Sequence, residues 1–460
     1  NERGLQWIDK EDWVYETCFT LAADMMRKEN MELVFEGLDT YADVYLNDEC
    51  ILKADNMFRC WSIPVRQYIR EENNILKVYF HSPVKIDVPK WDALPYQYPA
   101  SNDQSENGGL FNKKISIFAR KAGYHYGWDW GPRLVTSGIW RPVYIRAWSD
   151  LRINDVFIEQ KEVGAGRAVI AGHVELDADK DMDGVLVTIT DEATGRVLGE
   201  WQADLKRGTN RVTVDFVLHK PKLWWSNGLG EPFLYRFRTD IIAGGELLDS
   251  KTERVGIRSL KVVHQPDKDG HTFYIELNGR PVFAKGANYI PSDNFLPRVT
   301  PENYKRTILD AAGVNMNMLR VWGGGIYEND VFYDLCDEHG IMIWQDFMFA
   351  CSMYPAEGAL LDNIHQEAVD NVKRLRNHAC IALWCGNNEC QDAWLGWGWK
   401  CEIERQNKEY ADKIWAQYRQ QYHVTLPGVV REYAPGTFYW PSSPFAFEGE
   451  MSATTDGDRH

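Results

Sequence analysis

The stretch NMNMLRVWGGGIYENDVFYDLCDEHGIMIWQDFMFA at residues 315–350 decides the fold class of the C-terminal part of the chain. An apolar run leads through three glycines into a segment with helical periodicity at 327–340, and a second apolar run follows at 340–350. A helix between two strand-like runs is typical of a β–α–β unit, in which the two strands are parallel.

The same alternation continues on both sides of this unit. Apolar runs lie at 280–290 and 380–389, and amphipathic segments at 301–314 and 364–378 separate the runs from one another. We therefore predict a series of parallel strands and helices after about residue 264. The pattern alone fits either a barrel or an open doubly wound sheet.

A polar or aromatic residue stands at the carboxyl end of each of four runs. These residues are Asn288, Trp322, Asp346 and Glu389. Because the carboxyl ends of parallel strands meet in one mouth, where active sites of such folds lie, we expect these side chains to share a site.

The region before residue 264 consists of short strand-like segments separated by turn residues. Segments such as 31–38, 42–48 and 73–81 predict a β-sandwich over residues 1–148. About seven further segments predict an immunoglobulin-like β-sandwich over 149–263. The predicted strand–helix domain then occupies 264–460.

Composition excludes several classes of protein. Hydrophobic residues at 44% and charged residues at 26% are typical of a soluble globular protein, and no apolar stretch is long enough for a membrane span. The net charge of −16 would repel nucleic acid. Nine cysteines without CxxC spacing, and the absence of a nucleotide-binding fingerprint, predict neither a metal nor any other cofactor.

The tetrad GNNE at 386–389 places a carboxylic acid and two amides just after a buried run. Glycosidic cleavage needs one acid to protonate the leaving oxygen and a second carboxylate, about 5–5.5 Å away in retaining enzymes. Glu389 could be such an acid, with Asn388 binding a sugar hydroxyl. The 19 tryptophans, several of them clustered, offer flat faces for sugar rings. The alternative is a loop glutamate that caps the next helix.

Several motifs resemble the β-mannosidases of glycoside hydrolase family 2, in the expected order along nearly the whole chain. They are LVFEGLDTYADVYLND (33–48), YGWDWGP (126–132), SGIWRPVYI (137–145), RVWGGGIYE (320–328), DFMFAC (346–351) and GNNE (386–389). The resemblance implies a jelly-roll sugar-binding domain, an immunoglobulin-like domain and a (β/α)8 barrel. It also implies a retaining exo-glycosidase that removes terminal non-reducing β-D-mannose from β-mannosides.

The resemblance also implies roles for single residues. Glu389 would be the acid/base, and Asn388 would bind the 2-hydroxyl, which is axial in mannose. Asp346 could be either a site residue or a structural hydrogen-bonding residue. Two departures from the family pattern are mild: Tyr289 stands where tryptophan is usual, and His378 is followed by alanine instead of proline.

Four further residues would bind the substrate if the resemblance holds. Trp322 would line the wall of the −1 subsite, and Trp397 would supply an aromatic face near the acid/base. Trp128 and Asp129 would reach into the mouth from the first domain, with Asp129 holding distal hydroxyls. The alternatives are packing for the tryptophans and turn capping for Asp129.

The second carboxylate is missing from the sequence. Four strand–helix units follow residue 264, with a fifth strand expected near 437–444, whereas a closed barrel needs eight. No Ser-Glu-Tyr-Gly-like stretch of the kind that carries family nucleophiles is present, and we expect Glu448 and Glu450 to be loop residues. We therefore predict that the chain holds an incomplete barrel, about its first half, and is inactive on mannosides. We also expect this incomplete barrel to be prone to self-association, and we leave its oligomeric state open.

Two rival interpretations remain. The chain could belong to another family 2 activity, such as β-galactosidase, β-glucuronidase or exo-glucosaminidase, although YGWDWGP argues against these. It could instead be a carbohydrate-binding protein without catalysis. The resemblance favours an exported, periplasmic or lysosomal location over the cytoplasm.

Overall fold

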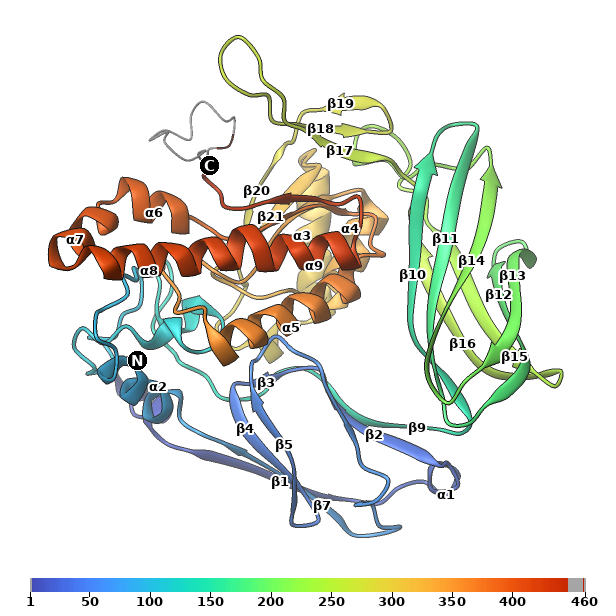
Figure 1. Cartoon of the computed structure of the whole chain (residues 1–460), viewed down its shortest axis with the longest axis horizontal. Coiled ribbons are helices and arrows are strands. Elements are labelled where there is room, and N and C mark those ends of the chain that lie inside the picture. Colours follow the sequence, from blue (N-terminus) through green and yellow to red (C-terminus); the bar gives the residue numbers. More distant parts are fainter. Residues whose placement is uncertain (1, 446–457, 459–460) are drawn as a thin grey trace.

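The chain folds into two β-rich parts followed by a part in which strands alternate with helices (Figure 1). The structure is a computed structural model, and it describes residues 2–445 and Asp458. Glu448 and Glu450, which we expect to be loop residues, lie outside the described residues.

Five parallel strands form the sheet that carries the candidate site. They are β20 (Gly286–Tyr289), β21 (Met318–Val321), β22 (Met342–Asp346), β23 (Ile381–Cys385) and β24 (Phe438–Trp440). The strands lie in the sheet in chain order, and every pairing is parallel. The predicted parallel strands are thus confirmed, and the order has no reversal of the kind that defines a doubly wound sheet.

The helices of this part follow the strands as predicted. After the first three strands come α3 (Pro301–Gly313), α4 (Asp330–His339) and α5 (Gly358–Leu375). The start of α3 is fixed by a capping box between Thr300 and Asn303, and α4 ends where Gly340 adopts a left-handed conformation with φ 67°.

After β23 the chain forms a series of helices. They are α6 (Cys390–Gly396), α7 (Trp399–Gln406), α8 (Lys408–Arg419), a π-helical turn (Gln420–Thr425) and α9 (Leu426–Tyr433). The break between α7 and α8 falls at Asn407, whose backbone is extended and whose side chain accepts the N–H of Glu409. An asparagine that caps a new helix in this way stops the preceding one.

The apolar run at 280–290 is two strands instead of one. Its first half, β19 (Arg280–Val282), pairs with β18 (Tyr274–Leu277) in an antiparallel sheet that also holds β17 (Leu260–Val263). Between β19 and β20, the side chain of Asn317 accepts the N–H of Lys285 and donates to the carbonyl of Phe283. These side-chain bonds replace strand pairing, so the chain turns from one sheet into the other.

The N-terminal part contains two sheets that enclose one core. One sheet has the order β1 (Trp13–Phe19), β7 (Asn74–Phe80), β4 (Tyr41–Leu46), β5 (Glu49–Asp55), and the other β6 (Trp61–Pro64), β2 (Asn30–Phe35), β9 (Val143–Trp148). A short pair, β3 (Leu38–Asp39) and β8 (Gly138–Ile139), and helices α1 (Ala23–Met26) and α2 (Pro83–Asp92) complete it. Buried Leu33, Val44 and Val78 from both sheets form the core, as expected of a sandwich.

The next seven strands form a second pair of antiparallel sheets. The first sheet has the order β10 (Leu151–Val163), β11 (Arg167–Ala178), β14 (Gly208–His219). The second sheet has the order β13 (Arg196–Leu205), β12 (Met182–Asp191), β15 (Tyr235–Ala243), β16 (Glu246–Val255). Ile170 and Val187 from facing sheets are both fully buried in a common core. The number of strands agrees with the number of segments that the sequence indicates.

Buried polar contacts hold the N-terminal part against the helices. Arg120, in the long loop before β8, makes a two-point ion pair with Glu367 of α5, with both N–O distances at 2.7 Å. Its guanidinium also donates to the carbonyl of Met348, just after β22. The loop is therefore fixed beside the carboxyl end of the parallel sheet.

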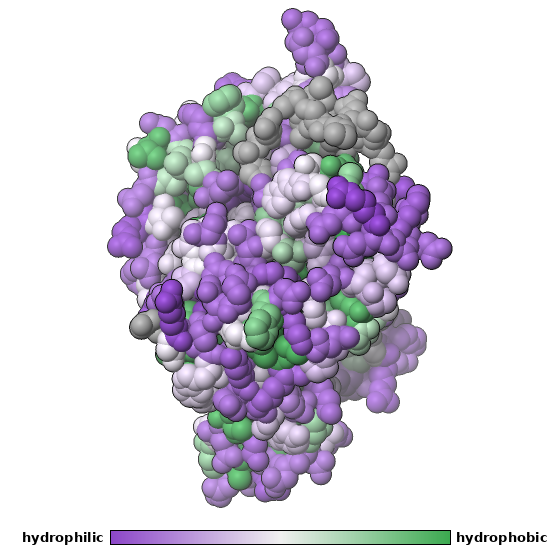
Figure 2. Space-filling model, turned by 90° about the vertical axis from the view of Figure 1, so that its left-hand side faces the viewer, coloured by the Kyte–Doolittle hydropathy of each residue, from purple (hydrophilic) through white to green (hydrophobic). Residues whose placement is uncertain are grey.

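Hydrophilic residues predominate on the face of the molecule shown in Figure 2, where hydrophobic residues appear only in small separate patches. Among the described residues, no helix combines the length and the apolar character that crossing a membrane requires.

Candidate active site

Arg320 is the centre of the site at the carboxyl ends of the strands. From β21 its guanidinium reaches Asn288 of β20 (Nη1–Oδ1 3.3 Å), Asp346 of β22 (Nη2–Oδ2 2.9 Å) and Asn388, three residues after β23 (Nη2–Oδ1 3.0 Å). One side chain thus joins the ends of four adjacent strands. Of the residues expected to share a site, Asn288 and Asp346 thus meet through Arg320.

The Arg320–Asp346 pair is buried, and both partners have further bonds. Asp346 also accepts the backbone N–H of Gly323 and the indole N–H of Trp344. Burial alone would lower the pKa of Arg320, but the negative charge of Asp346 holds it above its ordinary value. The guanidinium therefore stays charged and fixes the Asn388 amide with its nitrogen directed away from Arg320.

Sequence reasoning missed Arg320. The signal was present, because a positively charged residue stands in the middle of the otherwise apolar strand Met-Leu-Arg-Val at 318–321. A charge in a strand with every residue buried needs a partner, and the partner is Asp346 of the neighbouring strand.

Glu389 begins α6 in an unusual backbone conformation, with φ 62° and ψ 4°. Its N–H donates to the carbonyl of Ser443, and its carbonyl accepts the N–H of Ala393. The side chain makes no capping bond to the helix. Its Oε2 lies instead 3.0 Å from Sγ of Cys351 and 3.3 Å from Nδ2 of Asn388. The helix-capping alternative thus holds for the backbone of Glu389 but not for its carboxylate.

The Trp128 loop lies directly on the glycine loop that follows β21. The rings of Trp128 and Trp322 pack edge to face with centroids 4.7 Å apart, and Trp130 also meets Trp322, at 5.8 Å. A Cβ added at Gly324 would lie 1.9 Å from the ring of Trp322, so the loop requires glycine there. Since Gly323 binds Asp346, these aromatic rings adjoin the polar centre of the site.

Asp129 and Trp397 lie apart from these contacts. Asp129 is exposed on the Trp128 loop and makes no hydrogen bond or ion pair with the rest of the described chain. Trp397, at the end of α6, is 44% exposed, donates its indole N–H to Asp392 and packs against Trp399. The structure therefore joins Asn388 with Glu389 and Trp128 with Trp322, but neither Asp129 nor Trp397 to them.

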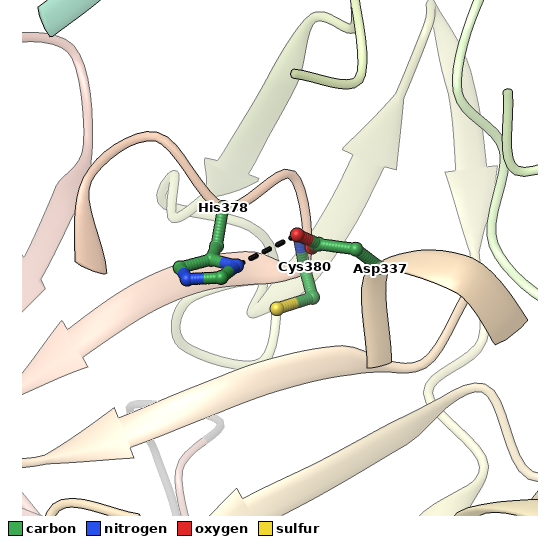
Figure 3. Close-up of side chains that lie close together, drawn as sticks. All are labelled: Asp337, His378 and Cys380. Carbon is green, nitrogen blue, oxygen red and sulfur yellow. Dashed lines mark hydrogen bonds and ion pairs between the residues drawn. The ribbon is translucent and has the colours of Figure 1, made fainter. Parts of the chain in front are cut away.

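A metal could be considered at Asp337, His378 and Cys380, whose ligand atoms lie within 4.8 Å of one another (Figure 3). This cluster is at the start of β23, the opposite end of that strand from Glu389. Asp337 accepts the N–H of Cys380 and bonds His378 Nδ1, both at 2.7 Å. Burial raises the pKa of the Cys380 thiol well above its ordinary value, which disfavours the thiolate that binds metals. The cluster fits a hydrogen-bonded tie between α4 and β23.

Two family models match adjoining parts of the chain. A model described as glycosyl hydrolase 2 galactose-binding domain-like matches residues 1–141, and one described as glycosyl hydrolases family 2 matches residues 151–258. The chain belongs to glycoside hydrolase family 2. The prediction drawn from the motifs is therefore confirmed at the level of the family.

Among its family 2 relatives, β-mannosidase B of Aspergillus clavatus is 36% identical over 100% of this chain and 53% of the relative. The corresponding protein of Thermothelomyces thermophilus is 35% identical over 100% of this chain and 52% of its own length. The chain thus spans about half the length of the curated relatives it matches.

Solved structures of other glycosidases resemble the fold of this chain. The crystal structure of a β-D-mannosidase from Dictyoglomus thermophilum matches 100% of this chain and 54% of its own, with a TM-score of 0.88 and 38% identity. A β-glucuronidase of Bacteroides uniformis matches 93% of this chain and 46% of its own, with a TM-score of 0.70. Its identity is only 19%, so this likeness concerns the fold alone.

Proposed function

We propose that this chain carries the acid/base side of a retaining β-mannosidase active site, which removes terminal non-reducing β-D-mannose from β-mannosides. The observation that carries the proposal is the network in which Arg320 holds Asn388 while Asn388 contacts the Glu389 carboxylate. Relatives at 35–38% identity are named β-mannosidases, which supports mannose as the sugar.

In the proposed mechanism Glu389 acts twice. As a carboxylic acid it protonates the leaving glycosidic oxygen while a second carboxylate attacks the anomeric carbon. As a carboxylate it then removes a proton from the water that releases the sugar. Asn388 hydrogen-bonds the 2-hydroxyl, and its fixed orientation means that little reorganisation is needed when the substrate binds.

The aromatic residues are proposed as the walls of the sugar site. Trp322 would line the −1 subsite, and Trp128 supports it through the edge-to-face contact. Asp129, exposed on the same loop, is free to hold distal hydroxyls of the sugar. Trp397 would have to contact a more distant part of the substrate, since it lies at the far end of α6.

We also propose that the parallel sheet is part of a (β/α)8 barrel. Its five strands follow chain order, and the edge strands β20 and β24 each have a single neighbour within the described chain. Residues 1–148 would be the jelly-roll sugar-binding domain, 149–263 the immunoglobulin-like domain and 264–460 the partial barrel. The second carboxylate is then expected in sequence outside this chain.

The test uses a full-length protein that contains this sequence, assayed for nitrophenol release from a panel of β-glycosides. We expect turnover of the β-mannoside and loss of at least about 100-fold in kcat on Glu389→Gln, since a general acid/base contributes that much. Turnover of a β-glucuronide, β-galactoside or β-glucosaminide instead would replace mannose with another sugar. Sugar binding without any turnover, unaffected by Glu389→Gln, would favour a carbohydrate-binding protein.

The 460-residue chain is itself a second test. Because the second carboxylate is expected in sequence outside this chain, we expect the chain to release no nitrophenol from the β-mannoside. Turnover by this chain comparable to that of the full-length protein would contradict the proposed position of the nucleophile.

A further inference from the structure

The thiol of Cys351 occupies a position beside the Glu389 carboxylate that the proposed mechanism does not use. Its Sγ donates to Oε2 of Glu389 at 3.0 Å and accepts the amide N–H of Asn388 at 3.3 Å. The amide nitrogen of Asn388 is also 3.3 Å from the same Oε2. The three side chains therefore form a closed triangle, and Arg320 fixes one corner of it through Asn388.

The backbone holds the two segments of this triangle together. The N–H of Cys351 donates to the carbonyl of Asn388 at 2.9 Å, and the N–H of Asn388 donates to the carbonyl of Phe349 at 3.0 Å. Cys351 and Glu389 both have left-handed backbones, with φ of 46° and 62°. Neither is a glycine, and such conformations persist only where the surroundings impose them, often at functional sites. The arrangement is thus set by the fold and does not depend on the thiol alone.

The thiol stays protonated in this setting. Cys351 is 2% exposed, and burial together with the negative charge of Glu389 raises the pKa of its thiol far above the ordinary value. It is therefore a neutral S–H group, which is a weak donor and whose sulfur is a weak acceptor.

A neutral partner of this kind suits a carboxyl group that must change its protonation state. An arginine or lysine at the same place would favour the carboxylate strongly and oppose its role as an acid. A thiol can donate to the carboxylate and, after rotation of its S–H bond, accept from the carboxylic acid. It holds the side chain in place in both states without a net charge.

We propose that Cys351 is a positioning residue for Glu389. The Cys351 thiol holds the Glu389 side chain by donating to the carboxylate and by accepting from the carboxylic acid. The inference rests on the proposed role of Glu389, but the contact itself can be tested without turnover. The competing explanation is that Cys351 only fills space.

Three variants of the 460-residue chain separate these explanations. Cys351→Ala removes the donor and the acceptor, whereas Cys351→Ser retains both on a shorter side chain. Cys390→Ala is the matched control, because its thiol is equally buried and adjacent in sequence but donates to the carbonyl of Asn388 instead of to the carboxylate. Thermal unfolding of each variant reports whether it folds.

The readout is the titration of the Glu389 carboxyl carbon by NMR in protein labelled with carboxyl-¹³C glutamate, its resonance assigned by its loss in Glu389→Gln. We expect Cys351→Ala to raise the pKa of Glu389 by about half a unit or more, because the charged form loses a donor. Cys351→Ser should lie closer to wild type than Cys351→Ala, and Cys390→Ala should match wild type. Equal pKa values in wild type and Cys351→Ala, or equal shifts in Cys351→Ala and Cys351→Ser, would overturn the proposal.

Kinetics of the full-length protein give the second readout. One limb of the pH–rate profile should be absent in Glu389→Gln. We expect Cys351→Ala to move this limb in the same direction as the NMR shift. The same variant should lower kcat more than it raises KM. Cys351→Ser should restore the profile in part. A protein without β-mannosidase activity would sink the proposed function while the NMR result still decides whether Cys351 holds Glu389. An unchanged profile in an active Cys351→Ala protein would overturn the positioning role itself.

Discussion

Arg320 and Asp346 face each other from neighbouring strands as a two-point ion pair, with Nη2–Oδ2 at 2.9 Å and Nε–Oδ1 at 3.2 Å. Both are buried, at 7% and 0% exposure. The nitrogens of the guanidinium also bind Asn288 and Asn388, so the pair sets the position of the amide beside Glu389. The site is therefore organised by the fold before any sugar binds.

Asp346→Ala should destabilise the protein strongly. Removal of one partner leaves the buried charge of Arg320 uncompensated, which costs about 3–5 kcal/mol in comparable pairs. Urea unfolding monitored by tryptophan fluorescence measures the free energy of unfolding. Asp412→Ala is the control, since it breaks an exposed pair with Lys408 and should cost less than about 0.5 kcal/mol. Equal effects of the two changes would show that the buried pair contributes no special stability.

The contact between Trp128 and Trp322 should couple the N-terminal part to the parallel sheet. Each side chain is nearly buried, so either change to alanine should cost about 3–5 kcal/mol. A double-mutant cycle should give a coupling of about 0.5–1.5 kcal/mol, the range for edge-to-face rings. Phe283→Ala, at a ring that is 84% exposed, is the control and should change stability by less than about 0.5 kcal/mol. Strict additivity at positions 128 and 322 would contradict the coupling.

Much of the fold follows from periodicity in the sequence. The runs that end at Asp346 and Cys385 are strands, and the amphipathic segments between them are helices, because apolar spacing reports directly which face is buried. The single run at 280–290 is an error, and it occurs where a polar side chain competes for backbone bonds. Asn317 divides this run into two strands, an effect that is not visible in hydrophobic spacing.

The candidate site was predictable where residues follow strands. Asn288, Asp346 and Asn388 meet because parallel strands end at one edge, which the sequence indicates. Arg320 was missed since the periodic pattern treats it as an interruption of an apolar run. The Cys351 contact depends on two left-handed residues in separate loops, and no local pattern predicts where such loops approach each other.

Glu32 should make stability depend on acidic pH. It lies on β2, where its carboxylate accepts hydrogen bonds from Arg146 and Ser62 of the same sheet and from Arg152 on β10. Burial alone would raise its pKa, but these partners lower it to about 2, whereas an unfolded glutamate titrates near 4.3. The stabilisation is therefore present above about pH 5 and is lost as the pH falls towards 2.

Glu32→Gln should accordingly lower the free energy of unfolding at pH 6 by about 1–2 kcal/mol, a value reduced for partial exposure to solvent. The difference from wild type should shrink towards pH 3. Urea unfolding of both proteins at the two values of pH measures it, with Glu162→Gln at the exposed pair with Arg167 as control. If the difference in unfolding free energy between Glu32→Gln and wild type grew as the pH falls, the lowered pKa of Glu32 would be contradicted.

Glu328 should have the opposite pH dependence. It is buried at the end of the glycine loop, where it accepts the hydroxyl of Tyr304, and burial raises its pKa to about 7. A raised carboxyl pKa means that its stabilising contribution is complete below about pH 4 and is lost as the pH rises through 7, because the folded protein must then bury a charge.

Glu328→Gln keeps an acceptor for Tyr304 but cannot ionise. Its free energy of unfolding relative to wild type should therefore rise by about 1–3 kcal/mol between pH 5 and pH 8. Urea unfolding at both values of pH measures this change, with the exposed Glu302→Gln on α3 as the matched control. The same difference at pH 5 and pH 8 would mean that Glu328 ionises freely in the folded protein and that burial does not keep it protonated.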